Sequence, residues 1–234
     1  MSATPLNVLL VSSSLFGEKG NSRELASAFV DALQASGHEH QLTHHDLVER
    51  DLPHLGAAEM QAWMTPADER SAEQRKLAEL SDGFLAELRA ADLLVIAAPL
   101  YNLGLPTQMK AWFDRVLRAG ETFRYTEKGP VGLLEGKQAL VLAARGGMYA
   151  GSDLDSQTPH LTSMLGLMGI TDQHFVYAEG LNMGDEQKVG ALSEARTGIA
   201  NYVDALPVAG NAQPWSSSTS SAPLRRACSS SIGG

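Results

Sequence analysis

Cysteine is nearly absent from this 234-residue chain, since the single cysteine is Cys228, close to the C-terminus. One thiol cannot form a disulfide framework, a cysteine-based zinc site or an iron–sulfur cluster. Long hydrophobic runs are missing too: Leu93–Leu100 falls far short of the roughly 20 residues that a membrane-spanning helix needs. No basic segment precedes the apolar run near the N-terminus, so we predict no signal peptide and expect a cytoplasmic protein.

Basic residues are in the minority, with 18 Lys and Arg against 27 Asp and Glu, for a formal net charge of −9. This balance argues against nucleic acid as a partner, because binding its phosphate backbone needs a basic face. Local contacts of Arg or Lys with a small anion remain compatible with it. Apolar residues make up 44% of the chain and charged residues 19%. The length suits one α/β domain, or at most two small ones.

Apolar periodicity is missing from residues 207–234, which are rich in Ser, Gly and Pro. Such a composition cannot bury enough surface to offset the entropy lost on ordering. We therefore predict a disordered tail over 207–234 and one compact domain over 1–206. Trp215 and Leu224 are isolated apolar residues of this tail.

Short apolar runs alternate with helical patterns along residues 1–206. The runs predict strands, the second of them the weakest, at Asn7–Ser13, Gln41–Leu47, Asp92–Ala98, Gln138–Ala144 and His174–Ala178. Helices are predicted from Ser22 onward and at Ser71–Ala90, Thr107–Ala119, Thr158–Met168 and Gln187–Leu206. Asp51–Asp68, with two prolines, is expected to be a long loop. Apolar strands alternating with helices predict a flavodoxin-like α/β fold: a doubly wound five-stranded parallel sheet with helices on both faces.

Ligands of a doubly wound sheet bind beyond the carboxyl ends of its strands, where three loops of this chain should meet. The first loop, Ser12–Ser22, offers hydroxyl groups, glycines and the N-terminus of a helix. Free N–H groups and the helix dipole there favour a phosphate, with Ser14, Asn21 and Ser22 as further donors. The loop lacks both GxGxxG and a Walker pattern. The alternative is that Ser22 only caps the helix and the other serines fill the loop.

The second loop, Pro99–Pro106, is unusually apolar. Its aromatic and leucine side chains could form a wall for a flat ring, with Asn102 and backbone amides as donors. The alternative is that these residues pack under a neighbouring helix or a second subunit.

The third loop contains the consecutive glycines Gly146 and Gly147. Glycines let backbone amides approach a ligand closely, and successive N–H groups can form an anion-binding nest. A phosphate cup, a ring wall and a nest together suit flavin mononucleotide (FMN). The nest would stabilise negative charge at the pyrimidine edge of the reduced flavin.

Several of these stretches resemble the FMN-dependent NADH azoreductase family, one of the flavodoxin-like NAD(P)H:quinone oxidoreductases. They are Pro99–Leu103, Thr122–Glu127, Ala144–Gly147, Gly169–Asp172 and the serine loop Ser13–Ser22. The similarity runs from about Asn7 to Tyr202. It departs from the family pattern at Ala144, where Ser or Thr is usual, and at Leu100 and Leu103, where Met and Phe are frequent.

The resemblance implies a homodimer with shared active sites, tightly bound FMN and NADH as electron donor. It implies two-electron ping-pong reduction of quinones and reductive cleavage of aromatic azo bonds to amines. By this resemblance, the FMN phosphate is bound by Ser14, Gly20, Asn21 and Ser22. The isoalloxazine ring is bound by Leu100, Tyr101, Asn102 and Leu103, and its pyrimidine edge faces Ala144, Arg145, Gly146 and Gly147. Leu167, where some members have Phe, is expected to line the substrate site. These departures affect substrate preference more than FMN binding.

Tyr125 is the candidate proton donor to an azo nitrogen, with water as the alternative. Its segment, Thr122–Tyr125, is either a projection over the site or a hairpin in a dimer contact. Arg124 and Arg145 are the cations to consider for a preference for NADPH over NADH. The physiological acceptor is left open by the sequence.

Two other functions compete with the enzyme, and a metal site is not expected. An FMN electron carrier without small-molecule turnover would share the same loops. A receiver-type signalling module is disfavoured, because Ser12–Ser14 stand where carboxylates would have to hold a metal ion. His44 and His45, adjacent on a strand, should point to opposite faces of the sheet and so cannot easily share a metal ion.

Overall fold

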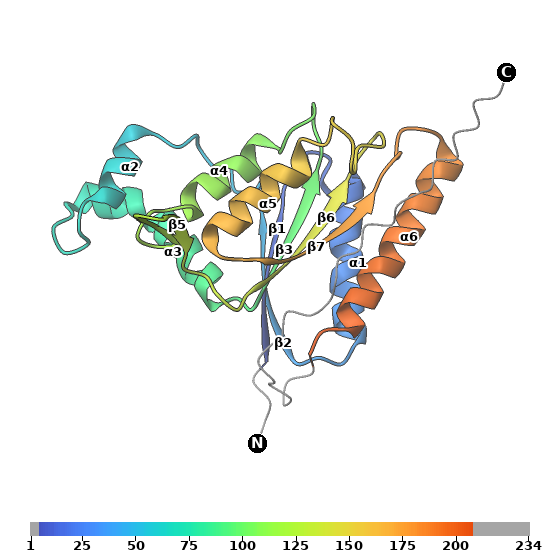
Figure 1. Ribbon diagram of the computed structural model, residues 1–234, viewed down its shortest axis with the longest axis horizontal. Helices are drawn as coiled ribbons and strands as arrows, with labels where there is room; N and C mark the ends of the chain where they lie inside the picture. The colour runs from blue at the N-terminus through green and yellow to red at the C-terminus, as the bar shows by residue number, and fades with distance from the viewer. Residues whose placement is uncertain (1–4, 208–234) are drawn as a thin grey trace.

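A five-stranded parallel sheet forms the centre of the computed structural model, which describes residues 5–207 (Figure 1). Its order is β2-β1-β3-β6-β7. The strands are β1 (Leu6–Ser12), β2 (His40–Asp46), β3 (Leu93–Pro99), β6 (Gln138–Ala144) and β7 (Asp172–Ala178). This is the flavodoxin-like order with its switch point between β1 and β3, so the predicted fold class is confirmed. All but the first residue of the predicted tail, Trp215 and Leu224 included, lies outside the described residues.

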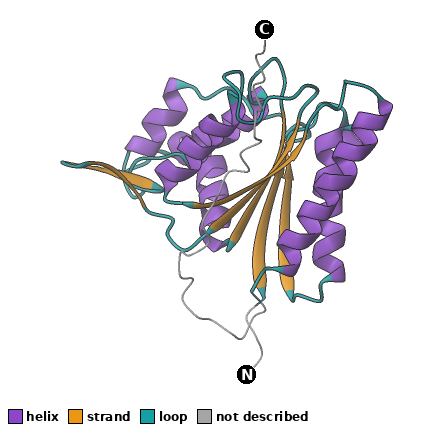
Figure 2. Cartoon of the chain, turned by 45° about the vertical axis from the view of Figure 1, so that its right-hand side comes forward, coloured by secondary structure: helices purple, strands orange, loops and turns teal. Residues whose placement is uncertain are grey.

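Helices cover both faces of the sheet (Figure 2). One face packs against α1 (Asn21–Ala35) and α6 (Asp185–Asp204), and the other against α3 (Ala72–Ala90), α4 (Thr107–Val116) and α5 (Gln157–Met168). Every residue of β3 is buried, and its side chains alternate between the two cores. A strand buried on both faces must be apolar throughout, which is why the apolar runs located the strands. None of the helices within residues 5–207 is long and apolar enough to span a bilayer.

The expected long loop Asp51–Asp68 contains a helix, α2 (Ala57–Met64), so that prediction was wrong. Its prolines stand outside the helix, and its residues are mostly good helix formers. The buried guanidinium of Arg115 on α4 donates to Glu59 Oε2 at 2.8 Å and ties α2 to the body. Arg118 also lies 5.0 Å from the centre of the Trp63 ring.

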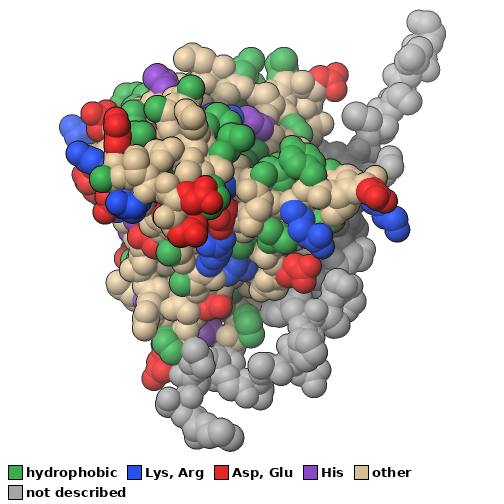
Figure 3. Space-filling model, turned by 90° about the vertical axis from the view of Figure 1, so that its left-hand side faces the viewer, with side chains coloured by type: hydrophobic (Ala, Val, Ile, Leu, Met, Phe, Trp, Pro, Cys, Tyr) green, Lys and Arg blue, Asp and Glu red, His purple; other side chains and the backbone are tan. Residues whose placement is uncertain are grey.

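An antiparallel hairpin, β4 (Phe123–Thr126) and β5 (Gly129–Gly132), projects from the body (Figure 2). Its base packs on the end of α5, where a Cβ on Gly132 would overlap the backbone of Gly169. Figure 3 faces the end of the molecule that carries this hairpin, α2 and α3, and shows hydrophobic side chains between charged ones. The exposed large apolar residues of this end are Met60, Met64, Tyr125, Val131 and Leu133.

The adjacent histidines of β2 face opposite sides of the sheet, as predicted. His44 Nε2 lies 2.9 Å from Ser12 Oγ, whereas His45 packs edge-on against Phe84 of α3 and pairs with Glu87. Among the described residues, no three His, Cys, Asp or Glu side chains lie together as metal ligands.

Candidate functional site

A cleft of about 230 Å³ opens beyond the carboxyl ends of β1, β3 and β6. It continues into a more open hollow of about 490 Å³, with Leu100, Gly146 and Asn182 shared between the two. Eleven of the twelve residues expected to hold a cofactor line one or the other: Gly20, Asn21, Ser22, Leu100, Tyr101, Asn102, Leu103, Ala144, Arg145, Gly146 and Gly147. The twelfth, Ser14, lies directly against Gly20. The structure therefore brings the three predicted loops together.

The first loop presents unpaired hydrogen-bonding groups at the start of α1. Gly20 is the N-cap residue, and the N–H groups of Asn21 and Ser22 find no acceptor within residues 5–207. The hydroxyls of Ser13 and Ser14 are buried and have no partner in the described part of the chain. Buried polar groups are seldom left unpaired. Donors collected at a helix N-terminus suit an anion, and a phosphate above all.

The second loop is a strained turn across Tyr101–Gly104. Asn102 and Leu103 adopt left-handed φ angles of 50° and 59°. The Tyr101 N–H donates to the Gly104 carbonyl at 3.1 Å, and the Gly104 N–H donates back at 2.9 Å. The Ser156 hydroxyl donates to the Leu103 carbonyl. Strain of this kind in a non-glycine residue persists only where its surroundings hold it, and is frequent at binding sites.

Tyr101 also connects the second loop to the first. Its hydroxyl accepts a hydrogen bond from the Leu15 N–H at 3.2 Å, and Phe16 lies edge-on to its ring with the centroids 6.3 Å apart. Leu15 and Phe16 are largely exposed at the rim of the cleft. The part of the cleft formed by Phe16, Leu100 and Tyr101 is thus apolar and aromatic, as a flat ring requires.

The third loop turns its carbonyl groups away from the cleft. Those of Arg145, Gly146 and Gly147 accept hydrogen bonds from the N–H groups of the β7–α6 loop, over residues 180–182, at 2.9 to 3.1 Å. The N–H groups of Gly146 and Gly147 have no acceptor within the described residues. A Cβ on Gly146 would come within 2.6 Å of Asn182 Nδ2, so any larger residue there would have to displace the Asn182 side chain from the cleft. These two successive free N–H groups are the donors that the predicted anion-binding nest requires.

Arg145 is buried, and its side chain is fully occupied by the protein. The guanidinium donates to Gln157 Oε1 at 3.1 Å, Thr158 Oγ1 at 2.8 Å and Glu179 Oε1 at 3.1 Å, and it pairs with Asp155 Oδ1 at 3.1 Å. It also lies 4.8 Å from the centre of the Tyr177 ring. The suggestion that this cation recognises a 2′-phosphate was therefore wrong. Only the backbone of Arg145 is available to the cleft.

The buried carboxylate beside this guanidinium stays ionised. Burial opposes ionisation of Asp155, but hydrogen bonds from Thr158 and the charge of Arg145 outweigh it and lower the pKa of the carboxyl group. Burial is also the main cause of the raised pKa of the Tyr177 hydroxyl. Asp155 is therefore charged beside Arg145 at neutral pH.

Three residues of the predicted loops that were not named as cofactor contacts, Phe16, Pro99 and Tyr149, also line the cleft or the hollow, and sequence reasoning missed Leu181 and Asn182 altogether. Leu181 and Asn182 follow β7, the fifth strand. The rule that placed the site at the carboxyl ends of the strands applied to this loop as well, so the signal was there.

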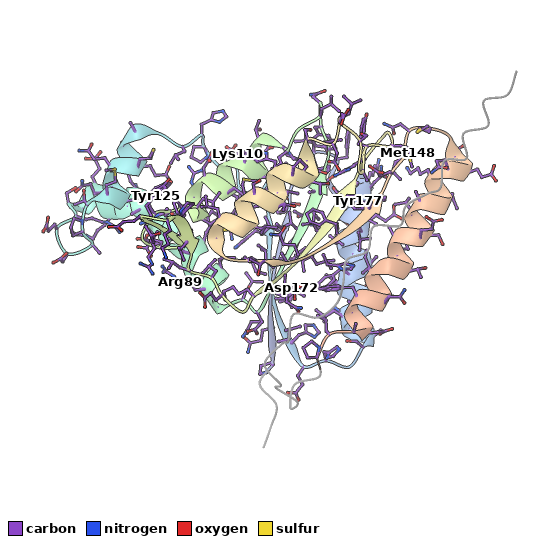
Figure 4. All side chains as sticks on the ribbon, viewed as in Figure 1. Arg89, Lys110, Tyr125, Met148, Asp172 and Tyr177 are labelled. Atoms are coloured by element: carbon purple, nitrogen blue, oxygen red, sulfur yellow. The ribbon has the colours of Figure 1, made fainter. Side chains whose placement is uncertain are left out.

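Tyr125 and Leu167 do not line the cleft of their own chain. Tyr125 is 74% exposed on the hairpin, and Figure 4 places it on the opposite side of the molecule from Met148, which follows the Gly-Gly loop. Leu167 lies in the last turn of α5, whereas the cleft is near the first turn of that helix. Arg124 is on the same hairpin as Tyr125, outside the cleft.

Comparison with known proteins identifies similar chains, which are matched over nearly their whole length. A family model described as flavodoxin-like fold matches residues 6–203. A protein from Alteromonas mediterranea named FMN-dependent NADH:quinone oxidoreductase is 51% identical over 192 residues, which cover 82% of this chain and 96% of the relative. An azoreductase structure from Bacillus anthracis superposes with a TM-score of 0.78 at 27% identity, covering 85% of this chain and 99% of that chain.

A further Bacillus anthracis structure is described as an FMN-dependent NADH-azoreductase in complex with FMN. It superposes with a TM-score of 0.76 at 25% identity and covers 85% of this chain and 97% of that chain. These similarities extend over the whole described domain, including the strands and all the loops that form the cleft.

Proposed function

This chain belongs to the flavodoxin-like fold family, and from that membership and its three-loop cleft we propose that it is an FMN-dependent NADH:quinone oxidoreductase with azoreductase activity. FMN is its bound cofactor, NADH its electron donor, and quinones and azo compounds its acceptors. A cytoplasmic location, where NADH is supplied, is part of the same proposal.

The observation that carries this proposal is the meeting of three complementary surfaces in one cleft. Unpaired N–H groups and the buried Ser14 hydroxyl at α1 suit the phosphate. The Tyr101–Gly104 turn suits a flat ring. The free N–H groups of Gly146 and Gly147 suit the pyrimidine edge. The three features match the three parts of FMN.

FMN, when bound, supplies the two-electron chemistry that connects a hydride donor to a quinone or an azo bond. The chain's own task is to bind, orient and stabilise charge. The Gly146 and Gly147 N–H groups are fixed because the carbonyls of their loop are bonded to residues 180–182. Donors held in place before the reaction stabilise developing negative charge without a cost of reorganisation. No side chain of the cleft has to act as a nucleophile.

The proposal includes a homodimer in which each chain completes the other's site. Phe16 lines the cleft and Leu103 the hollow, and both side chains are exposed, as expected for a surface that another chain or a substrate covers. Tyr125 and Leu167, on the hairpin side, are then candidates to line the acceptor site of the partner. Sedimentation velocity of the purified protein tests the dimer directly.

An FMN electron carrier is the competing reading, and steady-state kinetics separate the two. The proposed enzyme oxidises NADH when benzoquinone is present, and double-reciprocal plots at several fixed quinone concentrations give parallel lines, as ping-pong kinetics require. A carrier binds FMN but shows no NADH oxidation with quinone, which would refute the proposed function.

A further inference from the structure

Gln157, in the first turn of α5, links two loops of the cleft through its side-chain amide. It is 1% exposed. Its Nε2 donates to the Pro99 carbonyl at 3.0 Å, and its Oε1 accepts from Arg145 Nε at 3.1 Å. Pro99 lies two residues before the Tyr101–Gly104 turn, which we call the ring-wall turn, and Arg145 directly precedes Gly146 and Gly147.

The connection continues on both sides of Gln157. Beyond Arg145, the Glu179 carboxylate accepts from the guanidinium and, through the same oxygen, from the Tyr149 and Ala150 N–H groups at 2.9 Å each. Next to Gln157 in the sequence, the Ser156 hydroxyl donates a hydrogen bond to the Leu103 carbonyl. The start of α5 therefore holds the ring-wall turn near both of its ends. A chain of hydrogen bonds, buried at Gln157 and more exposed at Ala150, then reaches the residues that follow the Gly-Gly pair.

We propose that Gln157 is a positioning residue of the FMN site: it sets the spacing between the turn that faces the ring and the loop that faces the pyrimidine edge. The inference rests on the proposed function, because FMN is the ligand that would report this spacing. Glutamine suits the position because it donates and accepts at once. Glutamate has no donor for the Pro99 carbonyl, and methionine of similar length offers neither group.

Replacing Gln157 leaves a carbonyl and a guanidinium N–H buried without partners. An unsatisfied buried group is costly, so the two loops should shift to find new partners or water. Q157M should then weaken FMN binding about 5- to 30-fold. It should also change the FMN midpoint potential, because the nest N–H groups would no longer be held where charge develops.

Gln173 of β7, which donates to the carbonyl of Thr162 in α5, provides a control away from the cleft. It is a partly buried glutamine whose Nε2 donates to the Ile170 carbonyl at 2.7 Å and to the Thr162 carbonyl at 3.3 Å, and whose Oε1 has no partner within the described residues. Q173M removes two hydrogen bonds that a glutamine amide donates to carbonyl groups, but Gln173 lines neither the cleft nor the hollow. Both substitutions remove side-chain hydrogen bonds, but only Q157M removes bonds to residues that line the cleft.

The test compares wild-type, Q157M and Q173M protein stripped of FMN. Each is titrated with FMN by flavin fluorescence, its FMN midpoint potential is measured, and amide hydrogen exchange at Tyr149 and Ala150 is followed without FMN. We expect weaker binding, a shifted potential and faster exchange in Q157M only. Equal results for Q157M and Q173M in all three measurements would overturn the inference.

A second variant, Q157E, keeps the acceptor for Arg145 but sets a carboxylate oxygen against the Pro99 carbonyl. It should bind FMN more weakly than wild type, and wild-type binding would refute the link to Pro99. Q157E also serves if Q157M does not fold. If wild-type protein itself fails to bind FMN, the proposed function fails, whereas wild-type binding with no effect of either Gln157 variant defeats this inference alone.

Discussion

Gly20→Ala tests the phosphate end of the cleft most sharply. Gly20 has an ordinary extended backbone, with φ −80° and ψ 133°, so alanine is not excluded by its conformation. A Cβ there would overlap the Ser14 hydroxyl and lie 3.0 Å from Ser14 Cβ. Ser14 is buried, so its hydroxyl has to turn or the start of α1 has to move. Either change withdraws donors from the phosphate.

The magnitude follows from the hydrogen bond that is lost. A hydrogen bond to a charged group is worth about 1.5 to 3 kcal/mol. Since about 1.4 kcal/mol corresponds to a tenfold change in affinity, G20A should weaken FMN binding about 10- to 100-fold. The assay is titration of the FMN-free protein by flavin fluorescence. S14A should weaken binding to a similar extent, and G20A should add little to it, because both changes act through one hydroxyl.

Gly56→Ala is the matched control, because Gly56 is the N-cap of α2 with an extended backbone and nothing within 4 Å of its would-be Cβ. Both variants lose the same small preference for glycine over alanine at an N-cap. G56A should bind FMN as wild type does. FMN affinity unchanged in G20A, or effects of S14A and G20A that simply add, would refute the reasoning.

Three further predictions concern the buried ions, the acid limb of stability and the hairpin. Arg145→Met leaves buried carboxylates unpaired and should lower the free energy of unfolding by about 3 to 5 kcal/mol in urea unfolding. Lys110→Ala, in a partly exposed pair with Asp114, should cost less than about 1 kcal/mol, and similar losses for both would contradict the account. Burial lowers the pKa of His44 and His174, so below about pH 6.5 the unfolded chain binds their protons first and stability should fall as the pH drops. The double variant H44Q/H174Q should flatten that limb, and an unchanged slope between pH 7.5 and 5.5 would exclude these histidines as its cause. Tyr125→Phe should leave FMN bound but change turnover with some acceptors, and identical kinetics with every acceptor would remove Tyr125 from the site.

The parts of the structure that were predictable are those that follow from local patterns. Strand β3 is apolar at every position because both its faces are covered, and this pattern located the sheet. The loops after β1, β3 and β6 were then placed together by the topology of the fold alone. The helical pattern over Thr107–Ala119 likewise located α4, whose Trp112 and Phe113 are fully buried.

The features that were missed depend on partners far apart in the sequence. Helix α2 is tied down by Glu59 and Arg115, which lie 56 residues apart. Arg145 looked like a ligand contact because it adjoins two glycines. Its side chain instead pairs with Asp155, just before α5, and with Glu179, just after β7. No spacing rule pairs such residues before the fold is known. The hairpin was expected either to project over the site or to form a dimer contact. Its distance from the cleft could not be predicted, because it depends on the direction in which α5 runs.

The central claim is that this cleft holds an FMN that NADH reduces and a quinone reoxidises. The most direct measurement is the absorbance spectrum of the FMN-loaded protein, titrated with NADH in the absence of air and then mixed with benzoquinone. The account predicts a bound-flavin spectrum that bleaches with about one NADH per FMN and returns when quinone is added. A protein that retains no FMN, or a bound flavin that NADH cannot bleach, would contradict it.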